Sequence, residues 1–231
     1  MSFSLHVTDF VTIGLLVVLE GLLSADNALV MAVLVLGLPP ERHHQALRYG
    51  LVGGFAFRIA ATLLAVYLIQ VSWIKLLGGF YLAYLTVTHF THEGGAEARR
   101  DVPPARSLFG LPPFWATVVR VELINLAFSI DSILVAVGMS RNLVVVLSGG
   151  ILGIIAMRVV VGQLLELIKR YPALVDGAFV IIGWVAIKLV SEYLHAVGWL
   201  RWEIPTSFSL ATVGLIFVSA YIYARVTETK G

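Results

Sequence analysis

Residues 10–37 read FVTIGLLVVLEGLLSADNALVMAVLVLG, a long apolar stretch with two acids and an amide in its interior. This length exceeds the roughly 20 apolar residues that an α-helix needs to cross a hydrocarbon core of about 30 Å. A carboxylate at the centre of such a helix costs at least about 2.5–3.5 kcal/mol on insertion scales, so acids there usually face the interior of a bundle. We therefore expect a membrane helix with Glu20 and Asp26 turned inward.

The rest of the chain continues this pattern. Hydrophobic residues make up 59% of the 231 positions and charged residues only 13%, against about 45–50% and about 25% in ordinary soluble domains. We therefore predict an all-α polytopic membrane protein, a single membrane domain of seven transmembrane helices. The predicted helices follow seven apolar runs at about 10–37, 47–70, 73–90, 113–139, 143–168, 173–196 and 206–225.

Lysine and arginine counts in the short loops predict the orientation, because cytoplasmic loops carry the excess of positive charge. With the first loop in the cytosol, nine such residues lie on that side: Arg42, Arg48, Arg99, Arg100, Arg106, Lys169, Arg170, Arg225 and Lys230. The other side holds three, Lys75, Arg141 and Arg201. The N-terminus is therefore expected outside and the C-terminus in the cytosol.

The two halves of the chain resemble each other in order and at nearly constant offset, which indicates an internal repeat. Residues 24–30 match 129–135, residues 53–58 match 153–158, and Gly79 matches Gly183. Each unit holds three helices, an odd number, so the second copy is expected inverted, with a site near the midplane between the copies. This predicts repeat 1 at about 10–92, a cytoplasmic linker at about 93–112, repeat 2 at about 113–196 and a seventh helix at about 206–225.

Polar side chains form one stripe along each of two predicted helices. Glu20, Ser24 and Asn27 are four and three positions apart, which places them on one helical face. Asp26 lies about 100° around the helix from Asn27. The fourth run repeats the arrangement with Glu122, Asn125, Ser129 and Ser132 in the stripe and Asp131 one residue before its last member.

The two stripes offer carboxylate, amide and hydroxyl oxygens. Hard oxygen ligands suit Mg²⁺, Ca²⁺ and Mn²⁺ better than Cu(I) or Zn²⁺. We interpret the stripes as one divalent cation site divided between two related helices. A structural network remains the alternative, with the acids paired to Arg58, Arg158 and Lys188, because buried polar groups also hold membrane helices together. A proton relay through the same acids is compatible with either reading.

Arg58 and Arg158 occupy matching positions in the middle of their runs and are costly to bury unpaired. We expect them to be supporting counter-ions of the carboxylates, either paired statically or moving during transport. Lys188 is expected to pair with Glu192, four residues further along. The histidines at the cytoplasmic ends of the runs are expected to be solvated loop residues, with metal capture as the alternative: His43, His44, His89 and His92.

Missing residue types and motifs narrow the function. The sequence has no cysteine, which excludes disulfide bonds, catalysis by a thiolate and metal sites with thiolate ligands. It contains no nucleophile elbow, phosphate loop, HExxH motif or cofactor fingerprint, so we expect no enzyme. Its formal net charge is +2 and no basic cluster exceeds two adjacent residues, so nucleic-acid binding is not expected.

At the two acidic motifs the sequence resembles the TerC family of integral membrane proteins, and within it the short bacterial members. Residues 20–30 and 128–134 look like the family's paired signatures. The surrounding pattern agrees at Leu38-Pro-Pro, Phe57-Arg58, residues 74–79 and Met157-Arg158. The resemblance implies seven helices in a LysE-superfamily-like arrangement with two inverted triplets. It also implies Mn²⁺ export from the cytosol, with links to metal loading of secreted enzymes and to tellurite resistance.

The resemblance also directs the choice of ligands. It is firmest for Asp26, Asn27 and Asp131, which are expected to bind the ion. The first motif has Asp-Asn where the second has Asp-Ser, so an asymmetric site is implied. The remaining stripe residues complete or support the shell through carboxylate and amide groups, at Glu20, Glu122 and Asn125, or through hydroxyls, at Ser24, Ser129 and Ser132.

These expectations predict a divalent metal cation transporter of the bacterial cytoplasmic (inner) membrane that exports Mn²⁺, with proton exchange as a candidate driving force. Mn²⁺ is its transported substrate, and no organic cofactor is expected. Two alternatives stay open: a transporter of Ca²⁺ or Mg²⁺, and a non-transporting membrane partner that delivers metal to exported enzymes or scaffolds a complex. The partners considered are the divalent ion, the lipid bilayer, a second copy of the chain, secretion machinery and exported metalloenzymes.

Overall fold

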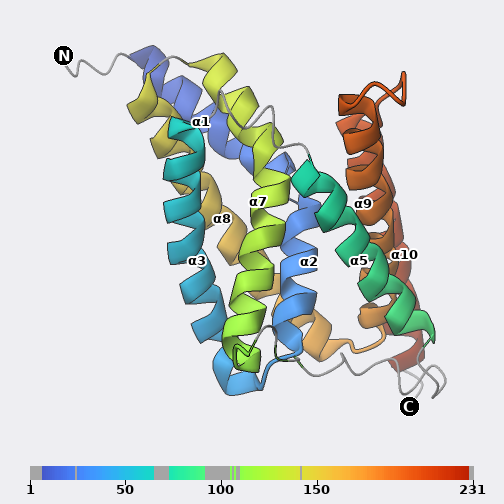
Figure 1. The fold of residues 1–231 in the computed structure, drawn as a ribbon. Helices are drawn as coiled ribbons and strands as arrows, with labels where there is room; N and C mark the ends of the chain where they lie inside the picture. Colours follow the sequence, from blue (N-terminus) through green and yellow to red (C-terminus); the bar gives the residue numbers. More distant parts are fainter. Residues whose placement is uncertain are drawn as a thin grey trace.

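A computed structural model describes most of the chain, and the regular elements in it are α-helices, as predicted (Figure 1). The described residues are 7–23, 25–64, 73–91, 105, 107, 110–140 and 142–228. The helices are α1 (Val7–Leu23), α2 (Ala25–Leu36), α3 (Pro40–Leu63), α5 (Trp73–Thr91), α7 (Pro113–Met139), α8 (Leu143–Arg170), α9 (Leu174–Ala196) and α10 (Thr206–Glu228).

Most helices begin and end close to the predicted apolar runs. The bounds of α5, α7 and α9 differ from their runs by at most one residue. The helix α3 starts earlier than its run, at Pro40, because proline suits the first helical position and Glu41 follows in the first turn. Residues 65–70 of that run lie outside the described residues.

The first run was predicted as one helix, but its described residues form two, α1 ending at Leu23 and α2 beginning at Ala25, and the two axes are inclined to each other (Figure 1). Ser24, between them, lies outside the described residues. The sequence at this point is Ser-Ala-Asp-Asn, residues 24–27. Serine, aspartate and asparagine offer the backbone alternative hydrogen bonds and so disfavour a helix interior. The polar motif therefore lies where α1 gives way to α2.

The helices pack in two groups with α2 between them. In the first group α1 packs along α8 and α3 along α7, and α3 also packs on α8. In the second group α5 packs along α9, with α10 on the other side of α9. The short helix α2 contacts both groups, on α7 and α8 and on α9 (Figure 1). The second polar motif lies on α7, a neighbour of α2.

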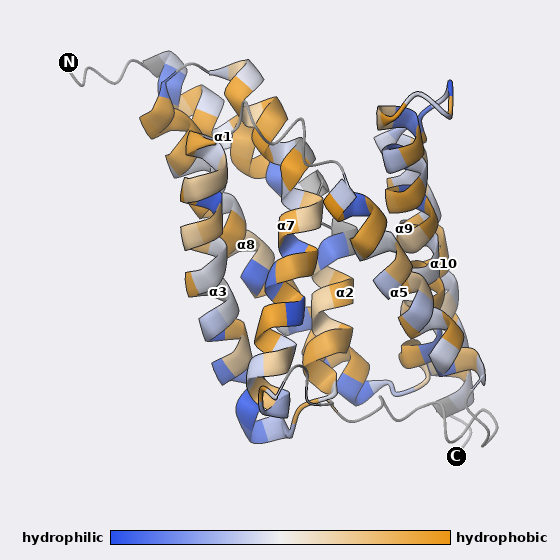
Figure 2. Cartoon of the chain, viewed as in Figure 1, coloured by the Kyte–Doolittle hydropathy of each residue, from blue (hydrophilic) through white to orange (hydrophobic). Residues whose placement is uncertain are grey.

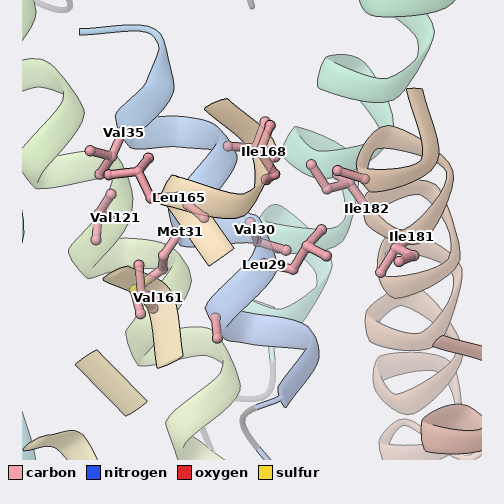
Figure 3. Close-up of a cluster of buried hydrophobic side chains, with 14 of the residues drawn as sticks. Leu29, Val30, Met31, Val35, Val121, Val161, Leu165, Ile168, Ile181 and Ile182 are labelled. Atoms are coloured by element: carbon pink, nitrogen blue, oxygen red, sulfur yellow. The ribbon is translucent and has the colours of Figure 1, made fainter. Parts of the chain in front are cut away.

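The main hydrophobic cluster surrounds α2. Nearly every described side chain from Ala28 to Val35 is buried. Side chains from α7, α8 and α9 meet this helix, with Val121, Val161 and Ile182 among them (Figure 3). Because α2 is buried along most of its length, its polar first turn also lies close to α7 and α8.

Some of the described helices meet the requirements for crossing a membrane. Four segments are long and apolar enough: Pro113–Ile130, Leu143–Arg170, Leu174–Ala196 and Thr206–Thr227. Of the rest, α1 is 17 residues long, and α3 carries Arg48 and Arg58, which lower its hydropathy. On α10, Leu215 and Phe208 are 71% and 57% exposed, as expected for side chains that face lipid.

Candidate functional site

Polar side chains gather inside the first group of helices and at the start of α2. Figure 2 shows hydrophilic bands within α3, α7 and α8 and on the first turn of α2. The most deeply buried of these side chains are exposed by 1–7%, and they are Glu20, Asn27, Arg58, Glu122 and Ser132. We call these five residues, with Asn125, the polar interior. All six are residues that the sequence singled out.

The strongest contact in the polar interior is an ion pair between α1 and α3. The two guanidinium nitrogens Nη1 and Nη2 of Arg58 donate to Oε1 and Oε2 of Glu20 at 2.9 and 2.8 Å. Arg58 Nη1 also donates to Oγ of Ser132 at 3.2 Å, and that hydroxyl donates to the carbonyl of Ser129 at 3.1 Å. The bidentate geometry is the strong form of this interaction. It makes Arg58 the counter-ion of Glu20.

Glycines on α8 create the space for this ion pair. A methyl group added at Gly150 would lie 2.6 Å from Nε of Arg58. One added at Gly153 would lie 2.5 Å from Cγ of Glu20. Real Cβ atoms essentially never approach other heavy atoms so closely, so a side chain at either position would force Arg58 or Glu20 to shift. The contact made by Gly150 is therefore with a charged group, the guanidinium of Arg58.

A second buried carboxylate lies on the opposite side of the polar interior. Glu122 of α7 faces α3, where a methyl group added at Gly53 would lie 2.8 Å from its Cδ. Within the part of the chain that the structure describes, Oε2 of Glu122 has no hydrogen-bond partner. Glu20 and Glu122 are thus both packed against glycines, but only Glu20 has a described counter-ion.

A small cavity adjoins Glu122. Its volume is about 30 Å³, and Asn125 and Arg158 also line it, with apolar walls from Met31, Met157 and others. A polar cavity holds a water molecule once it offers about 10–15 Å³ measured in this way. The site therefore has room for a water molecule or a bare cation beside a carboxylate and an amide.

The helices that carry the two acidic motifs contact each other through their amides. Nδ2 of Asn27 on α2 donates to Oδ1 of Asn125 on α7 at 3.4 Å. The structure thus brings together one member of each predicted stripe. Asn125 also lies close to α3, since a methyl group at Gly54 would approach its Nδ2 to 3.3 Å.

The remaining predicted ligands fall outside this description. Ser24 and the side chains of Asp26 and Asp131 lie outside the described residues, so their part in the site stays a prediction. Among the described histidines and acids, no group of three or more is arranged to hold a metal ion. The described polar interior therefore supplies two carboxylates, two amides and one hydroxyl as candidate ligands, and one of the carboxylates is engaged by Arg58.

A second charged cluster joins α5 to α9, and the sequence identified only part of it. Lys188 and Glu192 approach to 3.9 Å, as predicted. Nζ of Lys75 lies closer, 2.9 Å from Oε2 of Glu192, and Lys75 is only 8% exposed. Lys75 lies in the first turn of α5, within the predicted run 73–90, and packs against α9, a contact that the sequence did not predict. Spacing along the chain could not pair residues 117 positions apart.

Two of the histidines expected in solvated loops are buried instead. Nε2 of His43 makes a 2.7 Å hydrogen bond with the carbonyl of Leu38, and burial lowers the pKa of its imidazole below the ordinary 6.5. His89 stacks on Phe179 at 3.7 Å and bonds Oδ1 of Asp176 at 2.8 Å. Both histidines make packing contacts near the predicted cytoplasmic ends of their helices. His44 is exposed, as expected.

Comparison with known proteins shows which family the chain belongs to. The chain matches the family described as "Integral membrane protein TerC family" over residues 5–230. "Uncharacterized membrane protein YceF" of Bacillus subtilis (strain 168) is 43% identical over 221 residues, which cover 94% of this chain and 83% of that protein. "UPF0053 inner membrane protein YgdQ" of Escherichia coli (strain K12) is 23% identical over 227 residues, 90% of this chain and 92% of that protein. No solved structure matches the chain.

Proposed function

Because the chain belongs to the TerC family of integral membrane proteins, we propose that it transports a divalent cation and exports Mn²⁺ from the cytosol. One observation carries the proposal. Asn27 of α2 and Asn125 of α7 meet inside the bundle, beside a buried carboxylate, Glu122, whose Oε2 has no described partner. Oxygen ligands drawn from separate helices, with a buried negative charge, suit a hard divalent cation that must bind and leave.

The ion would be held by oxygens from two helices. Asp26, Asn27 and Asp131 are the proposed ligands. Glu122 and Asn125 complete the shell from α7, where the cavity lies. Glu20 supports it from a distance, because Arg58 occupies both of its oxygens. The hydroxyls, at Ser24, Ser129 and Ser132, are further candidate ligands.

Proton exchange would provide a route for release. Protonation of a ligating carboxylate removes its charge and its ligation together, so metal affinity falls as protons bind. An exporter of this kind would take up protons where it releases Mn²⁺. Mn²⁺ is then the substrate, and no organic cofactor is invoked.

Two inverted three-helix repeats would provide the architecture. Contacts between α5 and α9 support this proposal because they are reciprocal. A methyl group at Gly79 of α5 would meet Cγ2 of Val190, and one at Gly183 of α9 would meet Cγ2 of Thr86. Gly183 and Val190 each follow their counterparts, Gly79 and Thr86, by 104 positions. The pairs α1–α8 and α3–α7 exchange in the same way when the two halves are interchanged.

We further propose that the protein lies in the bacterial cytoplasmic membrane with its N-terminus outside. The helix α3 begins at the end of the bundle where α8 and α10 end (Figure 1). The last turns of α8 and α10 carry Lys169, Arg170 and Arg225, and Arg42 lies near the start of α3. Positive charge collected at one end marks the cytosolic face.

Mn²⁺ flux into liposomes that contain the purified protein tests the function. Wild-type protein should move Mn²⁺, and the Asp26→Ala/Asp131→Ala variant should not. Glu122→Gln should lower the flux by about 10–100-fold, the usual scale for loss of a group that supports a metal site. Glu166→Gln is the matched control, since Glu166 is an exposed acid on α8 and its loss should change nothing.

The same assay separates the alternatives. Equal flux from wild type and from the double aspartate variant would contradict the proposed site. A wild type without Mn²⁺ flux that moves Ca²⁺ or Mg²⁺ would change the ion. A wild type that moves none of the three would favour the non-transporting partner that serves exported enzymes or scaffolds a complex.

A further inference from the structure

The two arginines that occupy matching positions in the chain are in different states. Arg58 is 3% exposed and holds Glu20 with two hydrogen bonds. Arg158, 100 positions later, is only partly buried and lines the cavity beside Glu122. No ion pair joins Arg158 to a carboxylate of the described residues. Glu20 and Arg58 thus form an ion pair, whereas Glu122 and Arg158 line one cavity without a described ion pair between them.

The packing around the two arginines explains the difference. Gly150 leaves just enough space for the guanidinium of Arg58, so that group is clamped between α3 and α8. The glycine 100 positions earlier, Gly50, faces the carboxylate of Glu122 instead, at 3.3 Å from Oε1. Among the described glycines, none faces the side chain of Arg158. Arg158 therefore lacks the close glycine contact that confines Arg58.

The cavity gives Arg158 somewhere to move. It lies between the carboxylate of Glu122 and the side chain of Arg158, and both line it. Glu122 is 7% exposed, and a buried carboxylate is costly unless a cation or several hydrogen bonds compensate it. Arg58 is already engaged by Glu20. Of the described residues that line the cavity with Glu122, Arg158 is the one that carries a positive charge.

We propose that Arg158 is the tethered counter-ion of Glu122, crossing this cavity to pair with the carboxylate when the transported cation leaves. The proposal rests on the proposed function, and in the structure Glu122 and Arg158 line the same cavity. Arg158 is a positioning residue: it competes with the substrate for one carboxylate and keeps the site from holding a bare buried charge between transport steps. Arg58, by contrast, stays paired throughout.

Mn²⁺ binding and transport kinetics of Arg158→Gln test this role. Loss of the competing cation should tighten equilibrium Mn²⁺ binding by about tenfold, the factor that corresponds to about 1.4 kcal/mol. Turnover should fall at the same time, because release is no longer assisted. Arg158→Lys should restore much of both properties. Arg48→Gln, at an exposed arginine of α3, is the matched control and should behave as wild type.

A double-mutant cycle keeps the inference testable apart from transport. Thermal unfolding of metal-free protein should show that Glu122→Gln and Arg158→Gln are non-additive, as expected for two residues that interact. Additive effects, or Mn²⁺ binding by Arg158→Gln that is unchanged or weaker, would overturn the proposal. If wild type neither binds nor moves Mn²⁺, the proposed function fails, while the cycle still decides whether the two side chains pair.

Discussion

At the scale of single residues, Glu20 and Arg58 explain how an acid and a base are both tolerated midway along apolar helices. Each is costly to bury alone, but the bidentate pair satisfies both carboxylate oxygens, and Ser132 accepts a further hydrogen bond from the guanidinium. The pair also connects α1, α3 and α7. Its first role is therefore to hold the helices that surround the candidate site.

Arg58→Ala should destabilise the protein strongly. Breaking a buried pair by removing one partner costs about 3–5 kcal/mol, because the other charge is left uncompensated. The loss would appear as a lower thermal midpoint of the detergent-solubilised protein. A second variant, Glu20→Gln/Arg58→Gln, removes both charges and should recover part of the stability.

Arg48→Ala provides the control, since Arg48 is exposed on the same helix and its loss should leave the midpoint nearly unchanged. An Arg58→Ala protein that unfolds at the wild-type temperature would show that the pair does not form in the membrane protein. A double variant less stable than Arg58→Ala would show that the charges themselves are not the cause.

At the scale of elements, the spacing of glycines decides how closely the helices approach. On α8, Gly149, Gly150 and Gly153 face Leu16, Arg58 and Glu20, which lie on α1 and α3. Gly162 lies on the same helix and has no such neighbour. Glycine lowers helix stability, so its use at three nearby positions reflects the need for space rather than a local preference.

Gly153→Ala should therefore destabilise the protein, and Gly162→Ala should not. The added methyl group at position 153 would lie 2.5 Å from Cγ of Glu20, an overpacking that costs about 1–3 kcal/mol. At position 162 the same change meets open space and gains up to about 1 kcal/mol of helix propensity. Thermal unfolding of the two variants in one detergent measures the difference. Equal midpoints would contradict the close approach of α1 to α8.

At the scale of the whole molecule, the orientation in the membrane can be tested with introduced thiols, because the chain has no cysteine of its own. Glu41→Cys and Arg201→Cys replace exposed residues at opposite ends of the bundle. A membrane-impermeant thiol reagent applied to intact cells should label position 201 and leave position 41 unlabelled until the cells are opened.

The reverse labelling result would contradict the proposed orientation. Labelling at position 41 and protection at 201 would reverse the orientation and direct transport the other way for the same conformational cycle. Labelling of both positions in intact cells would place both of them outside. That result would contradict the odd number of membrane crossings predicted between positions 41 and 201. Mn²⁺ transport by each cysteine variant checks that the labelled protein is still native.

Much of the fold could be predicted because the signals are local. Apolar runs set the bounds of α5, α7 and α9 within one residue, whereas α3 begins well before its run, at Pro40. The i, i+4, i+7 spacing predicted one helical face for Glu20 and Asn27, but the two residues lie on different helices, α1 and α2. The change of direction between α1 and α2 was missed, although the residues around it were singled out as polar. Apolar residues precede and follow the polar motif, and their hydropathy is the same whether the helix is straight or changes direction there. Hydropathy therefore could not predict the change of direction.

The partners of the polar residues came from tertiary structure alone. The sequence identified Glu20, Glu122, Arg58 and Arg158 as the charges of the site, and it predicted pairing without saying which acid meets which base. Spacing along one helix determines which side chains share a face. Which residue lies opposite depends on how closely two distant helices pack, and the glycines at 150 and 153 set that distance. For this reason Arg58 closes on Glu20 while Arg158 stays open beside Glu122.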